Sequence, residues 1–295
     1  MQKFILSCES TVDLPYSWAQ SRNISVLFYH YLMNDQTIED DMGRDPTAPV
    51  QFYTKLRKGE TPLTSQINSI EYQEYFSELV QRANVLHIVL GSGMTGSINN
   101  AILAAEQVNQ QSEHQVHVID SFCSCGGYGL LCNLAANDRD NGLSIEETKQ
   151  HILSMRFHVQ HHFFTDDLHY FARTGRISSL MNSFANILDI FPLMKLNHEG
   201  KIIMCEKIHG KKNLIKKMVE NMIQTADDGT DYHGDCYIMH ADEPAEAIAL
   251  RHAVEASFPF LRGKILIKSI GPIIGAHCGP GTVSLYYMGK ERDNA

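Results

Sequence analysis

The chain has 295 residues, of which 43% are hydrophobic and 20% are charged, a balance typical of a globular protein. Its 25 Lys and Arg residues are outnumbered by 34 Asp and Glu residues, so the net charge is −9 at pH 7. An acidic chain is repelled overall by phosphate backbones and anionic lipid surfaces. The composition therefore excludes a disordered protein and predicts that nucleic acid is not a partner.

Signals for export, membrane insertion and metal binding are absent from the sequence. The apolar run at positions 4–6 is too short for a secretory signal, and no stretch has the roughly eighteen apolar residues of a spanning helix. The seven cysteines form no C-x-x-C pair, and the histidines at 158, 161 and 162 match no standard ligand spacing. We expect a cytoplasmic protein with reduced thiols, no metal, no integral membrane association and at most transient membrane contact.

In the first half of the chain, short apolar runs alternate with helix-like stretches. The expected strands are Lys3–Ser7, Ile24–Tyr31, Asn84–Leu90 and Val116–Ile119. The expected crossover helices are Pro49–Lys58, Ser69–Arg82 and Ser97–Val108. This alternation predicts an α/β fold with a mostly parallel sheet flanked by helices. Ligands of such sheets bind at the carboxyl ends of the strands, which places the loops after residues 7, 90 and 119 at a binding site.

The pattern changes after an expected helix at Ser144–Phe157. Further strands are expected at Val159–Phe164, Ile202–Ile208, Asp235–His240 and Lys264–Ile270, with helices at Asn213–Asp227 and Glu243–Ala256. A chain of this length can bury two cores. We therefore expect an N-terminal α/β lobe over residues 1–157 and a second α/β lobe over residues 158–295, with no flexible linker between them.

The segment Gly91–Gly96 fits the pattern G-x-G-x-x-G between an expected strand and an expected helix, and Asp120 ends the next strand. A dinucleotide could bind there, as in a Rossmann oxidoreductase. The glycines could also serve only to form a tight turn. In a third interpretation, the helix amino end and the hydroxyls of Ser92 and Thr95 bind an anion such as a carboxylate.

Five further segments carry a family resemblance. Residues 9–14 read ESTVDL, close to an opening DSTxDL with Glu9 in place of Asp, and residues 62–66 read PLTSQ, followed by Ile67 where proline is usual. Residues 120–126 contain DS and a later glycine, and 170–178 read YFARTGRIS, similar to YLxxGGRIS. Residues 270–281 read IGPIIGAHCGPG, close to IGPVIGAHTGPG. Residues 91–97 are in addition similar to SSxLSGT. With these motifs in the family's order, the sequence resembles the DegV family over some 270 residues.

The resemblance implies a single two-lobed DegV domain that holds one long-chain fatty acid in a pocket between its lobes. Its carboxylate would be bound by Thr64, Ser92 and His277, while Arg176 is left outside this set. Further pocket residues are expected in the same motifs: Ser65, Gly91, Gly93, Thr95, Gly96, Ser121, Gly275 and Ala276. The chain itself would not be an enzyme and would need no cofactor.

The resemblance also implies a partner, an ATP-dependent fatty acid kinase that phosphorylates the presented carboxylate and feeds acyl phosphate into phospholipid synthesis. The family's kinase-docking stretch corresponds here to His209, Lys211 and Lys212, which could equally be a solvated helix face. The acyl tunnel is expected in the apolar stretch after Arg176, at Phe184, Ile187, Leu188, Ile190 and Met194. Ordinary core packing is the alternative for each of these five residues.

A hydrolase is a minor alternative. The pattern G-x-S-x-G of a nucleophile elbow is absent, but Ser92, His277 and Asp120 could together imitate a catalytic triad. Sequence separation does not exclude such a triad, so an esterase stays open beside the dinucleotide-binding hypothesis.

Overall fold

The computed structural model describes residues 4–177 and 189–292. A parallel four-stranded sheet has the strand order β2-β1-β6-β7. Its strands are β1 (Ile5–Glu9), β2 (Ser25–Leu27), β6 (Val85–Val89) and β7 (Val116–Asp120). The helices of this half are α1 (Tyr16–Ser21), α3 (Ser69–Leu79), α4 (Ser97–Asn109), α5 (Cys125–Asp140) and α6 (Ile145–Met155). Strand β6 is buried along its whole length, as a strand covered on both faces should be.

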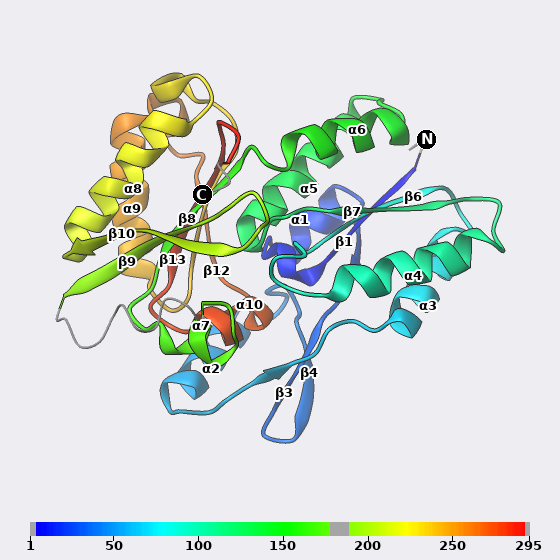
Figure 1. Cartoon of the computed structure of the whole chain (residues 1–295), viewed down its shortest axis with the longest axis horizontal. Helices are drawn as coiled ribbons and strands as arrows, with labels where there is room; N and C mark the ends of the chain where they lie inside the picture. The colour runs from blue at the N-terminus through cyan, green and yellow to red at the C-terminus, as the bar shows by residue number, and fades with distance from the viewer. Residues whose placement is uncertain (1–3, 178–188, 293–295) are drawn as a thin grey trace.

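A mixed six-stranded sheet occupies the other side of the molecule, with the order β10-β9-β8-β13-β11-β12 (Figure 1). Its strands are β8 (Val159–Phe164), β9 (Ile190–Leu196), β10 (Ile202–His209), β11 (Cys236–His240), β12 (Leu266–Ser269) and β13 (Val283–Met288). Helices α8 (Lys211–Thr225) and α9 (Pro244–Ser257) cover one face of this sheet. The other face belongs to the same core as the first sheet.

A small three-stranded sheet with the order β4-β3-β5 projects below the two large sheets in Figure 1. It consists of β3 (His30–Met33), β4 (Gln36–Glu39) and β5 (Leu63–Thr64). The remaining helices are α2 (Ala48–Arg57), α7 (His169–Arg173) and α10 (Pro272–Cys278), with short 3₁₀ turns at Ser10–Val12, Gly229–Asp231 and Pro259–Leu261. Helix α10 contacts α2, α7, β3 and β5, so this late segment of the chain packs against the small sheet.

Helix α5 joins the two large sheets, because it contacts β1 on one side and β8, β11 and β13 on the other. Its glycines permit this close packing. A methyl group on Gly127 would overlap the ring of His161, and one on Gly129 would lie 2.9 Å from the carbonyl oxygen of Val12. The sequence analysis did not predict α5, since a glycine-rich opening is unfavourable for a helix unless tertiary packing compensates.

Most of the expected elements are confirmed, including β6, α4, α6, β8 and β11, and the α/β class is correct. The expected single strand Ile24–Tyr31 is wrong, because the chain turns at Phe28 and Tyr29 and supplies β2 and β3 to different sheets. Strands β9 and β13 were not predicted. No helix was expected at 272–278, where Pro272 begins α10.

The division into lobes at residue 157 stays a prediction. The strand β8 begins at Val159, but one continuous cluster of buried side chains includes residues from both large sheets. Among the described residues, no helix is long and apolar enough to span a bilayer.

A buried carboxylate fixes the start of the glycine loop. Glu9, at the end of β1, accepts a hydrogen bond from the Tyr72 hydroxyl and a 2.9 Å bond from the backbone N–H of Leu90. Burial raises the pKa of Glu9 from 4.5 to about 7, and the hydrogen bonds of Tyr72 and Leu90 offset part of this increase. Glu9 thus binds its proton more tightly in the folded state than in the unfolded state.

This linkage makes stability depend on pH. Because the folded pKa of Glu9 is the higher one, its contribution is complete below pH 4.5 and is lost as the pH rises towards 7. We predict that, between pH 5 and pH 8, the wild-type protein loses roughly 2 kcal/mol more unfolding free energy than Glu9→Gln, which cannot ionise. Urea denaturation at both pH values measures the difference. Parallel pH profiles for the two proteins would contradict the assignment.

Candidate ligand-binding site

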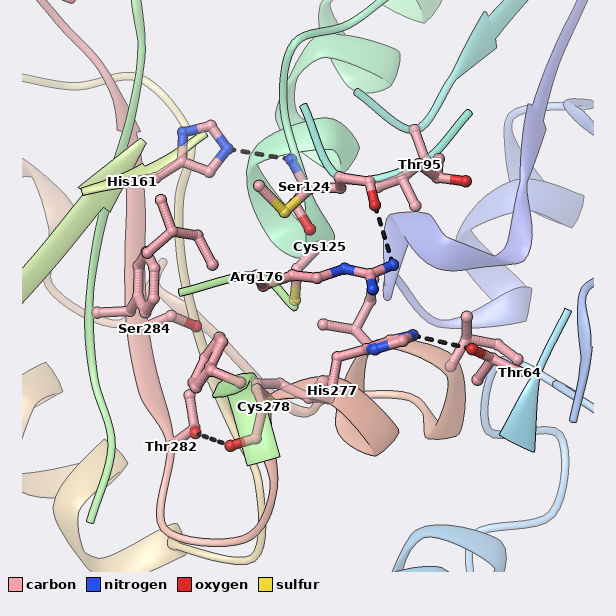
Figure 2. A pocket seen from close by; sticks show the side chains of 18 of the residues that line it. Thr64, Thr95, Ser124, Cys125, His161, Arg176, His277, Cys278, Thr282 and Ser284 are labelled. Carbon is pink, nitrogen blue, oxygen red and sulfur yellow. Dashed lines mark hydrogen bonds between the residues drawn. The ribbon is translucent and has the colours of Figure 1, made fainter. Parts of the chain in front are cut away.

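A pocket lies where the six-stranded sheet, α10, the small sheet and the glycine loop meet (Figure 2). Its volume is about 240 Å³, far more than the roughly 30 Å³ that one water occupies. Its apolar lining comes from the six-stranded sheet, α7, α10 and the segments next to them and to the glycine loop: Leu90, Met94, Phe163, Phe171, Leu196, Ile202, Ile270, Ile273 and Ile274. Ser65 and Gln66 line it and are exposed, so they mark its mouth.

At the mouth, Thr64 on β5 and His277 on α10 form a hydrogen bond, with 2.9 Å between Thr64 Oγ1 and His277 Nε2. Burial, together with the smaller effect of the charges of Arg176 and Arg173, lowers the pKa of His277 to about 4. The ring is therefore neutral at pH 7. A neutral imidazole and a hydroxyl have two polar hydrogens between them, and their mutual bond uses one.

The second hydrogen of this pair is available to a ligand. If the Thr64 hydroxyl donates to Nε2, the hydrogen of the ring is on Nδ1, which is buried and has no hydrogen-bond partner among the described residues. If Nε2 donates instead, the hydroxyl hydrogen of Thr64 is the one left over. A buried unpaired polar atom is costly unless a ligand or water satisfies it.

Arg176 supplies a positive charge beside His277. Its guanidinium donates to the carbonyl oxygens of Thr174 and Met94, the latter at 3.1 Å, and its side chain lines the pocket. Burial lowers the pKa of Arg176, but an arginine stays charged at pH 7. The sequence analysis left Arg176 outside the carboxylate set, because motif spacing alone could not show that it lies next to His277.

In the glycine loop, Thr95 and not Ser92 lines the pocket. Ser92 is exposed, and its backbone N–H donates to the Asp120 carboxylate at 3.1 Å. The Thr95 hydroxyl oxygen accepts from the N–H of Ser97 at 3.2 Å, so its own hydrogen is free to donate. The expected contact between Ser92 and a ligand therefore has no geometric support in this structure.

Most of the further expected pocket residues do not line the pocket, and several of the glycines among them allow close packing instead. Ser65 and Thr95 line the pocket, but Gly91, Gly93, Gly96, Ser121, Gly275 and Ala276 are not in its wall. A methyl group on Gly91 would lie 2.8 Å from the backbone of Cys123, and one on Gly93 would overlap the backbone of Gly200. Likewise, a methyl group on Gly275 would lie 2.5 Å from the hydroxyl oxygen of Tyr53.

The structure assembles neither the dinucleotide site nor the esterase-like catalytic triad that the sequence left open. The turn at Gly200 occupies the space beside Gly93 that a pyrophosphate would need, and the Asp120 carboxylate accepts the N–H groups of Ser92 and Phe122. Of the imitated triad, His277 bonds Thr64, and Ser92 lies outside the pocket. The described residues include no cluster of three or more side chains suited to a metal ion.

The expected tunnel residues divide into two groups. Phe184, Ile187 and Leu188 lie outside the described residues. Ile190 and Met194 belong to β9 but do not line the pocket, and Met194 is fully buried in the core. The wall uses Leu196 instead, together with Ile202 of β10.

The expected docking residues lie at the junction of β10 and α8. His209 is exposed, with Nδ1 3.5 Å from the carboxylate of Asp189, and Lys212 is exposed. Lys211 is bound within the molecule, since its ammonium lies 2.7 Å from Asp166 and 3.4 Å from Glu246.

Comparison with known proteins decides the family. A family model described as "Uncharacterised protein, DegV family" matches residues 3–290. The chain belongs to the DegV family. A DegV domain-containing protein of Clostridium perfringens is 29% identical, over 99% of this chain and 100% of its own length. A protein of Thermotoga maritima named fatty acid-binding protein is 26% identical, over 96% of this chain and 97% of its own length.

Solved structures confirm the two-sheet DegV fold. The structure titled DegV, a fatty acid binding protein from Bacillus subtilis, has a TM-score of 0.83 at 24% identity, covering 98% of this chain and 100% of its own. A DegV family protein from Thermus thermophilus, with fatty acid binding in its title, has a TM-score of 0.85 at 22% identity, with coverage of 98% and 100%. These Bacillus subtilis and Thermus thermophilus proteins, like the relative from Thermotoga maritima, are named for fatty acid binding.

The charge of Arg176 should be measurable at His277. We predict that Arg176→Gln raises the pKa of His277 above the wild-type value of about 4, because a nearby cation disfavours the imidazolium. The increase is partial, since burial is the larger cause. Titration of the His277 ring resonance by NMR tests this, with Lys212→Gln as an exposed control. An unchanged pKa in Arg176→Gln would show that the two groups do not interact.

Proposed function

We propose that this protein binds one long-chain fatty acid, with the carboxylate at the mouth of the pocket and the acyl chain inside. The observation that carries the proposal is the arrangement of the lining. Polar donors and one cation gather beside the exposed residues Ser65 and Gln66, and apolar side chains form the walls further in. The relatives and solved structures named for fatty acid binding support the same ligand class.

The proposed carboxylate clamp consists of Thr64, Thr95, Arg176 and His277. The Thr64–His277 pair and the Thr95 hydroxyl each have one polar hydrogen that can be donated to a ligand. Arg176 has five N–H hydrogens and donates to only two carbonyl oxygens, so it also has donors left for a ligand. Charge-assisted hydrogen bonds from a guanidinium to a carboxylate are stronger than neutral ones. Ser92, which the family resemblance implied, is replaced by Thr95 in this clamp because only Thr95 lines the pocket.

The acyl chain would supply most of the affinity. Burying about fifteen methylenes at about 0.8 kcal/mol each gives on the order of 12 kcal/mol before the cost of ordering the ligand. The clamp then fixes which end of the fatty acid faces solvent.

We further propose that the chain is a non-catalytic subunit that works in the cytoplasm. A separate ATP-binding fatty acid kinase would phosphorylate the carboxylate presented at the mouth, and the acyl phosphate would enter phospholipid synthesis. The orientation of the clamp supports this proposal, because the polar end of the pocket lies beside exposed residues. Of the residues expected to dock the kinase, His209 and Lys212 are exposed, whereas Lys211 is bound by Asp166 and Glu246.

Native mass spectrometry with lipid extraction tests the ligand. We predict that purified protein carries a C14 to C18 fatty acid, and that Thr64→Val lowers palmitate affinity by about tenfold through the loss of a charge-assisted hydrogen bond. Thr148→Val, which removes a buried hydroxyl outside the pocket, is the matched control and should bind normally. Hexadecanol should bind both variants equally, since it has no carboxylate. A protein that refuses added palmitate would overturn the proposal.

Trapping of acyl phosphate with hydroxylamine tests whether this chain or a separate kinase catalyses the phosphorylation. We predict no product from this protein with palmitate and ATP, and product when a bacterial fatty acid kinase is added. Lys212→Glu should reduce the rate with the kinase and leave palmitate binding unchanged, because the side chain is exposed and is not part of the lining. Product formed without the kinase would show that the chain is itself an enzyme.

A further inference from the structure

The inner end of the pocket is polar, although an acyl chain needs only apolar walls. Six residues form this inner polar wall: Ser124, Cys125, His161, Thr282, Ser284 and Tyr286. Figure 2 shows His161, Thr282 and Ser284 on one side of the pocket, with Thr64 and Thr95 on the other. Except for Ser124, the six are fully buried, so bulk water does not solvate their polar atoms.

Two of the three small hydroxyls of this wall, those of Ser284 and Thr282, have already used their hydrogens. Ser284 Oγ donates to the carbonyl oxygen of Met239 at 3.1 Å, and Thr282 Oγ1 donates to that of Cys278 at 3.0 Å. A carbonyl can only accept, so the hydrogen in each bond belongs to the hydroxyl. What Ser284 and Thr282 can still offer a ligand is lone pairs.

His161 is an acceptor for the same reason. Its Nδ1 lies 3.1 Å from the carbonyl oxygen of Val159, which requires the hydrogen to be on Nδ1. Burial and the charge of Arg292 lower the pKa of His161 well below its usual value, so the ring carries no second hydrogen. Its Nε2 therefore presents a lone pair, which accepts only a long 3.3 Å bond from the N–H of Ser124.

Tyr286 and Cys125 complete the wall. The Tyr286 hydroxyl interacts with both Ser284 and Cys125. The Cys125 thiol contacts the Asp13 carboxylate. Burial raises the pKa of both groups, which keeps them neutral. The wall is thus rich in acceptors whose natural complement is a hydrogen-bond donor.

We propose that the inner polar wall recognises a hydroxyl on the acyl chain, so that the preferred ligand is a hydroxylated long-chain fatty acid. This inference rests on the proposed function, which supplies the acyl chain. A saturated chain would bring no donor to the lone pairs of Thr282 and Ser284, and it would leave His161 Nε2 with only its long bond from Ser124 in a dry site. A keto group would bring another acceptor and would be disfavoured, whereas a hydroxyl brings the missing hydrogen.

Competition binding with delipidated protein tests the proposal. The ligands are stearate and a panel of hydroxystearates with the hydroxyl at successive positions along the distal half of the chain. We expect at least one isomer to bind about three- to tenfold more tightly than stearate, the gain typical of one added hydrogen bond. The matching ketostearate should bind more weakly than stearate.

Two variants test whether the inner polar wall causes the preference for hydroxystearate. Ser284→Ala and Thr282→Val should remove most of the preference for the hydroxystearate, and circular dichroism shows that they fold. Thr148→Val is the control, because it removes a buried hydroxyl outside the pocket and should keep the preference. If every hydroxystearate binds no better than stearate, or if the preference survives both variants, the inference is wrong. If stearate itself does not bind, the proposed function fails and this inference fails with it.

Discussion

The site depends on how the segment from β12 to α10 docks against the N-terminal half of the chain. The Lys268 ammonium donates to the carbonyl oxygen of Leu14 at 3.0 Å, the Tyr53 hydroxyl donates to that of Ile270 at 2.9 Å, and the Gly271 N–H donates to the Asp13 carboxylate at 2.9 Å. These bonds join residues more than two hundred positions apart. Because α10 is short and begins directly after Gly271, they also place His277 beside Thr64.

Burial gives the two ends of the pocket different chemistry. At the mouth, a neutral histidine is kept next to a permanent cation, so that positive charge is available without a buried imidazolium. At the inner end, the hydroxyls and His161 donate to backbone carbonyls. At both ends, a buried polar side chain is tolerated because most of its donors and acceptors form hydrogen bonds within the protein. The donors and acceptors that are left face the pocket.

The glycine loop shows why a motif can mislead. Gly91 and Gly93 fit a dinucleotide fingerprint by spacing, and in the folded chain they allow the backbones of Cys123 and Gly200 to approach closely. The same lack of a side chain serves both purposes, so spacing could not separate them. Ser92 and Thr95 are three residues apart at the start of a helix, and only the three-dimensional path of the loop selects Thr95 for the pocket.

The sequence by itself determined the α/β class, most of the strands and helices, the family and the presence of Thr64 and His277 at one site. These follow from local periodicity and from motifs whose residues are contiguous. It could not place α5, β9 or β13, because a glycine-rich helix and short apolar strands depend on packing with distant elements. Only the tertiary structure decided that Arg176 lies beside His277, that Thr95 replaces Ser92, and that His161 and Ser284 share a wall. Such contacts join residues that lie far apart in the sequence, and no local pattern in the chain records them.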